Sequence, residues 1–169
     1  TTGAYYPNLI IENSFGGNWL TGIGSAFTGV GIAAAIKGSF DVGGQGVNTV
    51  TFLNENTNAL TTLVQGSLII RSGSTLQNFG TGFEIQGDSL SVEGTLSYDA
   101  ADGRRIVFSG GVKTQNISGA GTIGLFDLIV NKSSDTLKLQ RAITIDNTLT
   151  LTNGPLILNQ KKLALVVAS

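Results

Sequence analysis

The chain has 169 residues, of which 41% are hydrophobic and 12% charged, and its formal net charge is −1. Its ten basic residues do not cluster, which argues against nucleic acid as a partner, because a nucleic-acid-binding protein needs a basic stripe. The chain has no Cys and no His, so it lacks a disulfide framework and the commonest metal ligand and acid-base catalyst. We therefore predict no metal ion and no cofactor.

The first 36 residues carry very little charge, and residues 13–36 contain no charged side chain at all. No run in the chain reaches the roughly 18 to 20 consecutive apolar residues of a membrane helix. We therefore predict a low-charge first coil or cap over residues 1–36 in preference to membrane insertion. Tyr5, Tyr6 and Trp19 lie near the chain start, where they suit either a sugar-binding face or a cap over the open apolar end of a repeat protein.

Six short stretches along the chain repeat one pattern, in which a Gly or Asn marker is followed by a small hydroxyl residue and then by an apolar residue. The markers are separated by 25, 28, 28, 27 and 26 residues, and such a regular period is typical of a repeat protein. The markers are Asn13, Gly38, Gly66, Gly94, Gly121 and Asn147.

Each position of this pattern predicts a local structure. Gly and Asn enter the left-handed backbone region most easily, so the marker predicts a tight bend at the same place in every turn. The hydroxyl residue predicts a ladder that joins successive turns, and the alternating apolar residues after it predict a strand with one buried face. The expected ladder consists of Ser14, Ser39, Ser67, Thr95, Thr122 and Thr148.

Each turn has room for about three short strands joined by corners. This arrangement predicts an all-β fold, a right-handed parallel β-helix (β-solenoid) of about six turns with 25–28 residues per turn. We expect residues 1–169 to form a single domain. A meander of antiparallel hairpins is the rival fold, but only Asn153-Gly154 resembles a two-residue hairpin turn.

The richest polar cluster of the sequence contains two Asp and two Arg. Paired carboxylates could bind Ca²⁺ or serve a polysaccharide-cleaving site, and Glu84 and Asp88 on the preceding turn could join them. The alternative is a charged corner with Asp at the turn and Arg in solvent, which we favour because the other acids are scattered. We therefore predict no catalytic residue. The cluster consists of Asp99, Asp102, Arg104 and Arg105.

Residues 106–165 carry a resemblance to a known group of proteins. The segments 115–122, 126–131 and 143–154 are similar to the repeat Q-x-I-S-G-x-G-T, F-x-N-L-x-I-N and V-x-G-T-L-x-L-x-x-G of large secreted surface proteins of Bacteroidota. Asp127 stands where Asn is usual, and Asn147 where Gly is usual. The resemblance implies export across the outer membrane by the type IX route and a role as an adhesin-like or scaffold module at the cell surface.

We therefore expect a non-enzymatic extracellular structural or adhesive module, with a carbohydrate-binding or polysaccharide-degrading β-helix enzyme as the alternative. Residues 163–167 are still strand-like where the sequence stops, and we expect it to be a segment of a longer polypeptide. A solenoid end exposes unpaired backbone groups, so an adjoining segment or a protein subunit should cover the C-terminal edge. Surface glycans are the other expected partners. A frayed tail after Leu156–Leu158 is the alternative.

Overall fold

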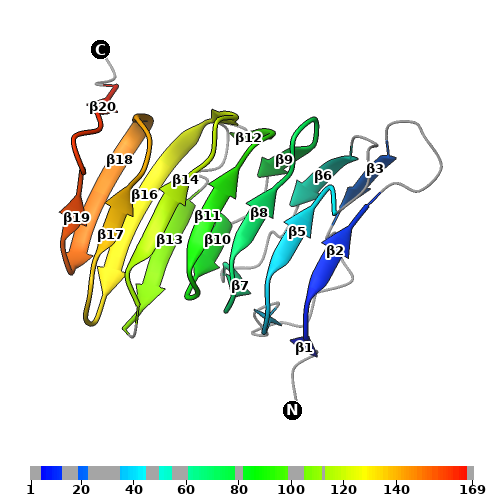
Figure 1. The fold of residues 1–169 in the computed structure, drawn as a ribbon, viewed down its shortest axis with the longest axis horizontal. Helices are drawn as coiled ribbons and strands as arrows, with labels where there is room; N and C mark the ends of the chain where they lie inside the picture. The colour runs from blue at the N-terminus through cyan, green and yellow to red at the C-terminus, as the bar shows by residue number, and fades with distance from the viewer. Residues whose placement is uncertain are drawn as a thin grey trace.

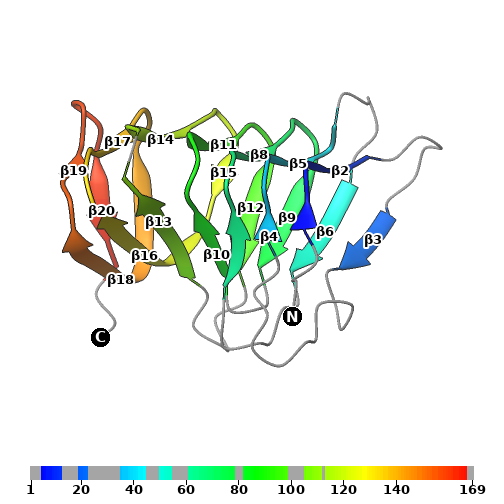
Figure 2. The ribbon, with the colours of Figure 1, turned by 90° about the horizontal axis from the view of Figure 1, so that it is seen from below.

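The computed structural model describes residues 5–12, 19–22, 35–44, 50–54, 61–78, 82–98, 105–111 and 113–166. In this part every regular element is a β-strand, and every strand pairing is parallel. The strands form sheets of eight, seven and five strands, called here sheets A, B and C. Figures 1 and 2 show them stacked along the long axis, and β1 and β20 are the outermost strands of sheet A. The fold is a β-solenoid, as predicted, and the rival hairpin meander is wrong.

The chain visits sheets A, B and C in turn, so the strands of one sheet are consecutive only in space. Sheet A consists of β1 (Tyr5–Tyr6), β4 (Ala35–Ile36), β7 (Thr62–Val64), β10 (Gly82–Ile85), β13 (Arg105–Gly110), β16 (Leu125–Lys132), β18 (Ile143–Asn153) and β20 (Leu163–Leu165). Sheet B consists of β2 (Leu9–Ile11), β5 (Phe40–Val42), β8 (Leu68–Ile70), β11 (Ser89–Val92), β14 (Gln115–Ser118), β17 (Leu137–Leu139) and β19 (Leu156–Ile157). Sheet C consists of β3 (Trp19–Gly22), β6 (Val50–Asn54), β9 (Thr75–Asn78), β12 (Thr95–Tyr98) and β15 (Thr122–Ile123).

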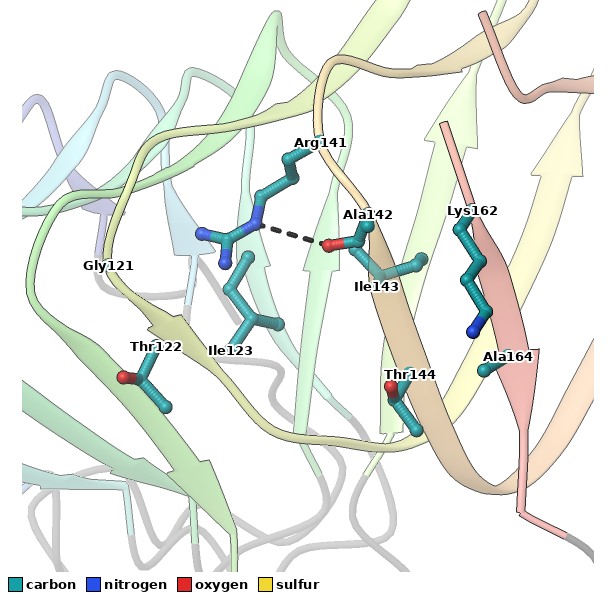
Figure 3. A pocket seen from close by; sticks show the side chains of 9 residues that line it. All are labelled: Gly121, Thr122, Ile123, Arg141, Ala142, Ile143, Thr144, Lys162 and Ala164. Carbon is teal, nitrogen blue, oxygen red and sulfur yellow. Dashed lines mark hydrogen bonds between the residues drawn. The ribbon is translucent and has the colours of Figure 1, made fainter. Parts of the chain in front are cut away.

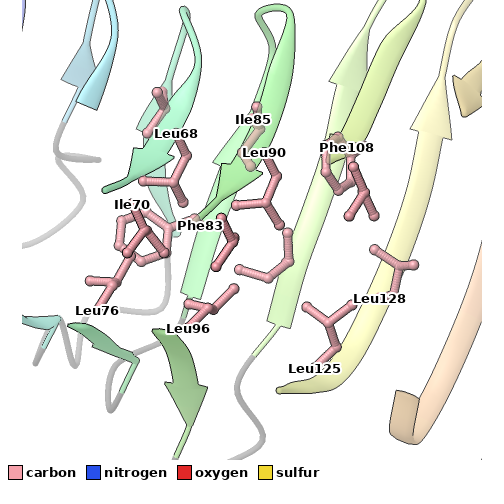
Figure 4. Close-up of a cluster of buried hydrophobic side chains, with 14 of the residues drawn as sticks. Leu68, Ile70, Leu76, Phe83, Ile85, Leu90, Leu96, Phe108, Leu125 and Leu128 are labelled. Atoms are coloured by element: carbon pink, nitrogen blue, oxygen red, sulfur yellow. The ribbon is translucent and has the colours of Figure 1, made fainter. Parts of the chain in front are cut away.

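The core is a set of apolar columns along the inside of the sheets. In sheet B, residues in register place five fully buried side chains above one another, and Figure 4 shows part of this packing. Burying each such side chain contributes about 2 kcal/mol, which is how a chain with short strands holds its coils together. The column consists of Phe40, Leu68, Leu90, Ile117 and Leu139.

The coils differ in length more than the spacing of the markers predicts. Corner residues that bond across adjacent coils are 31, 28, 22, 27, 22 and 19 residues apart, from the N-terminal to the C-terminal end. The expected 25–28 residues per turn therefore holds only for some coils, and the number of turns differs somewhat from six. The right-handed winding stays a prediction.

The marker residues do not form one column, which corrects the predicted bend. Gly38 and Gly66 lie at the corner between sheets A and B, whereas Gly94 and Gly121 lie at the corner between sheets B and C. Asn147 lies within β18, and Asn13 is outside the described residues. None of the described markers has a positive φ, so left-handed backbone is not the reason for glycine.

Close backbone approach is the reason that glycine is needed at these corners. A Cβ added to Gly66 would lie 2.6 Å from the carbonyl oxygen of Gly38 on the preceding coil. A Cβ added to Gly121 would lie 2.6 Å from the carbonyl carbon of Glu93. Contacts below 3 Å force the coils apart, so a side chain at these corners opposes the stacking that the sheets require.

The predicted hydroxyl ladder is split into two ladders, because the marker residues that precede the hydroxyls lie at two different corners. Thr95 lies in register with Thr75 and Thr122 in sheet C, so the predicted pairing with Thr122 is confirmed. The predicted pairing of Thr95 with Ser67 is wrong. Ser67 instead accepts a 3.1 Å hydrogen bond from the Ser89 hydroxyl at the other corner. Thr148 lies opposite Asp127, and Ser14 is outside the described residues.

Sheet C ends at β15, which changes the C-terminal part of the solenoid. The next coil runs from β17 into β18, and β18 rejoins β16 only where Leu125 lies opposite Ile145. The start of β18 pairs on its other side with β20, where Ile143 lies opposite Leu163. Residues 163–165 are therefore a strand as predicted, rather than a frayed tail, and residue 167 is outside the described part.

Candidate functional site

The polar cluster that sequence analysis singled out lies mostly beyond the described residues. Asp99, Asp102 and Arg104 are outside them. Arg105 begins β13, and its Nε is buried without a hydrogen-bond partner there. Among the described residues, no group of three or more acidic side chains is arranged to hold a metal ion, and no helix is long and apolar enough to cross a membrane.

Glu84 and Asp88 each contact the following coil, and they do so separately. Glu84 Oε1 accepts a 2.6 Å hydrogen bond from the Ser109 hydroxyl and a 3.0 Å bond from Gln86 Nε2. Asp88 forms a 3.1 Å ion pair with Lys113, and both side chains are more than half exposed, at 63% and 64%. The two carboxylates are therefore engaged in different contacts between coils.

An enclosed ion pair among the described residues links Asp41 in β5 to Arg71, which directly follows β8. Arg71 Nη2 lies 2.6 Å from Asp41 Oδ2, and Arg71 Nε donates to both carboxylate oxygens at 3.0 and 3.1 Å. The hydrogen bond to Asp41 raises the pKa of Arg71 above its ordinary value. Asp41 is only 7% exposed, so this forked contact is what makes its burial tolerable.

Two long polar side chains are buried inside the solenoid, and sequence reasoning missed both. Gln115 Nε2 donates to the carbonyl oxygens of Ile85 and Gly87, at 2.8 and 2.6 Å, and so ties β14 to the preceding corner. Lys132 Nζ donates a 2.9 Å bond to the carbonyl oxygen of Lys113, and burial lowers the pKa of Lys132. No local motif marks these positions, because their partners are 19 to 30 residues away.

The three aromatic residues predicted to form a cap or a sugar-binding face lie in β1 and β3. Tyr5 and Tyr6 form β1, and Trp19 begins β3, so all three belong to strands of the first coil. The structure describes their backbone but not their side chains. The choice between a cap and a sugar-binding face stays a prediction.

A pocket of about 360 Å³ lies where sheet C stops, between β15 and the start of β18. Figure 3 shows its two walls, with Arg141 above the gap and Lys162 beside it on the approach to β20. Two cations and two threonine hydroxyls line it, and no acidic side chain does. The lining residues are Gly121, Thr122, Ile123, Arg141, Ala142, Ile143, Thr144, Lys162 and Ala164.

No protein-family model, curated protein or solved structure matches the chain. The described residues show a β-solenoid of parallel strands, in agreement with the fold that the repeat predicts. The resemblance to the Bacteroidota surface group rests on the sequence motifs alone. No local motif marks the pocket, because its two cations are 21 residues apart and line one pocket only in the folded chain.

Proposed function

We propose that the chain is a non-enzymatic structural or adhesive module of an extracellular surface protein. The proposal rests on the observation that the acidic side chains form contacts between coils. Seven of them contact a residue of another coil, through bonds to a hydroxyl, an amide, a backbone N–H or a cation. They are Asp41, Glu84, Asp88, Glu93, Asp127, Asp135 and Asp146.

This distribution favours a structural role over catalysis. A glycosidase needs two carboxylates that face one another across a substrate, about 5 to 10 Å apart. The seven acids are instead distributed along the stack, where each one fastens a coil to another coil. A polysaccharide-degrading β-helix enzyme is therefore the less favoured function.

The extracellular location and the type IX export route come from the resemblance of residues 106–165 to Bacteroidota surface repeats. The fold is compatible with such a role, because a stack of coils makes a rigid spacer of extended shape. The location is tested on cells of the source organism with an antibody against residues 106–165. Loss of the signal after protease treatment of intact cells supports surface display, and a signal confined to the cytoplasm contradicts it.

The C-terminal end of the stack supports a partner that covers it. Leu151, Leu158, Leu165 and Val166 are 55%, 41%, 52% and 47% exposed there, whereas the apolar side chains of the core, from Ile36 to Ile145, are at most 5% exposed. An open coil end offers backbone groups and apolar surface to another strand. We propose that a further β-coil, from the same polypeptide or from a partner subunit, lies against this end.

Enzymatic activity and adhesion are separated by one pair of measurements on the same samples. The chain is incubated with a panel of polysaccharides, and both bound protein and newly formed reducing ends are measured, with heat-denatured protein as the control. Binding without release is expected for an adhesive module. Release of reducing ends by the native chain would overturn the non-enzymatic function.

The proposal that a further β-coil covers the C-terminal end is tested by light scattering and by amide exchange at residues 163–166. We expect concentration-dependent association that Leu151→Glu together with Leu165→Glu abolishes. Ile10→Glu is the matched control, because Ile10 is 57% exposed near the other end of the stack. A monomer with protected amides at residues 163–166 would show that the end needs no partner.

A further inference from the structure

We propose that the pocket between β15 and the start of β18 binds the carboxylate of an acidic sugar unit, such as a uronic acid in a surface glycan. This inference rests on the proposed adhesive function for its biological use, but the site itself is argued from geometry. Four observations support the proposed site: the gap between the strands, the free backbone edges, the two cations and the hydroxyls.

The gap exists because β15 and the start of β18 do not pair with each other, and each pairs with a strand on its far side. Thr122 in β15 lies opposite Thr95 in β12, on the N-terminal side of the pocket. Ile143 in β18 lies opposite Leu163 in β20, on the C-terminal side. The two walls meet only further on, where β16 and β18 pair. The pocket is therefore a fork between parallel strands, with backbone on both sides.

In the pocket wall formed by β15, the backbone N–H and C=O of one residue face the pocket. Thr122 N–H donates to the carbonyl oxygen of Gly94 at 2.8 Å, and Gly124 N–H donates to that of Leu96 at 2.8 Å. Backbone groups of successive residues in a strand point to opposite sides. The N–H and C=O of Ile123, between them, therefore face the pocket.

The opposite wall does the same from β18. Ile143 N–H donates to the carbonyl oxygen of Lys162 at 3.0 Å, and Ile145 C=O accepts from Val166 N–H at 2.9 Å. Both residues thus bond toward β20, and Thr144 between them directs its backbone toward β15 and β16. A ligand in the pocket has backbone donors and acceptors on both sides, which suits the many hydroxyls of a sugar.

Arg141 supplies a fixed positive charge over this gap. Its Nη1 donates a 2.9 Å bond to the carbonyl oxygen of Gly119, and its Nε donates a 3.4 Å bond to that of Ala142, which Figure 3 marks. These bonds hold the guanidinium in place, and no residue of the described part forms a hydrogen bond with its Nη2. A guanidinium held in this way binds a carboxylate well, because little freedom is lost when the ligand arrives.

Lys162 adds a second positive charge to the pocket lining, from the approach to β20. Neither Arg141 nor Lys162 forms an ion pair with a carboxylate of the described residues, and the pocket lining contains no acid. The positive potential is therefore uncompensated, and it selects an anion. Thr122 and Thr144 provide hydroxyls that complete a polar site for a sugar ring.

An acidic sugar fits the pocket better than an extended acidic peptide does. A peptide that adds to a sheet needs a continuous free edge of several residues. The free edge here consists of Ile123 on one wall and Thr144 on the other, which is too short. The volume of about 360 Å³ lies at the lower end of the range for small-ligand pockets.

The test measures binding of an oligogalacturonate by calorimetry at low ionic strength, with the methyl-esterified oligosaccharide as the neutral counterpart. We expect the neutral sugar to bind at least about tenfold more weakly, because it has lost the charge-assisted bonds. We expect Arg141→Gln to weaken binding of the acidic sugar about tenfold and Lys162→Gln to weaken it several-fold. Lys161→Gln is the matched control, since Lys161 is exposed beside Lys162 but does not line the pocket.

Three results would overturn the proposal. They are no binding of the oligogalacturonate, equal binding by the wild type and by the Arg141→Gln/Lys162→Gln double variant, and stronger binding of poly-glutamate or sulfate. If Arg141→Gln fails to fold, amide chemical shifts of Ile123 and Thr144 in the wild type decide the site, because bound sugar must shift them. Release of reducing ends would contradict the non-enzymatic function while leaving the binding site intact.

Discussion

The hydroxyl of Tyr98 donates a 2.7 Å hydrogen bond to Oδ2 of Asp146, which lies 48 residues further along the chain. The Tyr98 ring packs against Phe126 with 5.3 Å between ring centroids. It also lies beside Gly124, where an added Cβ would come within 3.3 Å of the ring. Tyr98 thus reaches past the intervening coil and fastens β12 to β18, next to the point where sheet C ends.

Removal of this hydroxyl should destabilise the C-terminal coils. Tyr98→Phe keeps the ring contact with Phe126 but leaves Asp146 without its donor, and we expect a loss of about 1 kcal/mol in the free energy of unfolding. A double-mutant cycle with Asp146→Ala, which removes the acceptor, isolates the pair when measured by urea denaturation. A coupling energy near zero would mean that the bond contributes nothing to stability.

The same bond makes stability depend on alkaline pH. The hydrogen bond to Asp146, with burial and the negative charge as smaller causes, raises the pKa of Tyr98 from 10.0 to about 12. Because the folded state holds this proton more tightly than the unfolded state, the contribution is complete below pH 10 and is lost as pH rises from 10 to 12.

Absorbance of tyrosinate against pH checks this titration directly. The chain has three tyrosines, so we expect a late step that Tyr98→Phe removes. The urea midpoint of the wild type should fall more steeply than that of Tyr98→Phe between pH 10 and 12. Parallel pH profiles for the two proteins would contradict the assigned shift.

Gly94 should be far less tolerant of a side chain than its backbone angle suggests. Its φ is not positive, but an added Cβ would collide with the carbonyl oxygens of Arg71 and Ser74 on the preceding coil. We expect Gly94→Ala to cost about 3 kcal/mol, because backbone must move to admit the methyl group. Gly73→Ala, where φ is +77°, should cost only about 1 kcal/mol from the left-handed backbone.

Thermal denaturation of the two glycine variants decides between these causes. A larger decrease in melting temperature for Gly73→Ala than for Gly94→Ala would contradict this prediction. It would mean that backbone conformation, rather than the close approach of coils, determines where glycine is required.

The Asp41–Arg71 ion pair should contribute much more to the free energy of unfolding than the exposed Asp88–Lys113 pair does. Arg71→Ala leaves a carboxylate that is 7% exposed without its partner, and we expect a loss of about 2 kcal/mol. Lys113→Ala breaks the exposed pair with Asp88 and should cost at most about 0.5 kcal/mol. Chemical denaturation in low and high salt measures both, and equal losses would contradict the role of burial.

The class of fold could be predicted from the sequence because alternation is a local property. Phe40 and Val42, like Leu68 and Ile70, are two residues apart and must point to the same face of a strand. Both pairs are fully buried. A chain that repeats this alternation between Gly-containing corners can bury its apolar face only by stacking, which is why a parallel solenoid follows.

The register of the coils could not be predicted, because similar corners look alike in sequence. Gly66 and Gly94 carry the same local pattern and are 28 residues apart, yet Gly87 is the glycine whose added Cβ would meet the Gly66 backbone. The coil at that point is only 22 residues long between bonded serines. Which corner stacks on which is decided by the packing of whole coils, and a count of residues between motifs does not contain that information.

The same limit explains why the candidate pocket and the Tyr98–Asp146 bond emerged only from the tertiary structure. Arg141 and Lys162 are unremarkable in sequence, and no local motif joins them. They line one pocket because sheet C ends at β15, which leaves the start of β18 to pair on one side only, with β20. The sequence alone determined that the chain alternates and repeats, whereas the contacts between coils, set by non-local packing, decided where its polar groups meet.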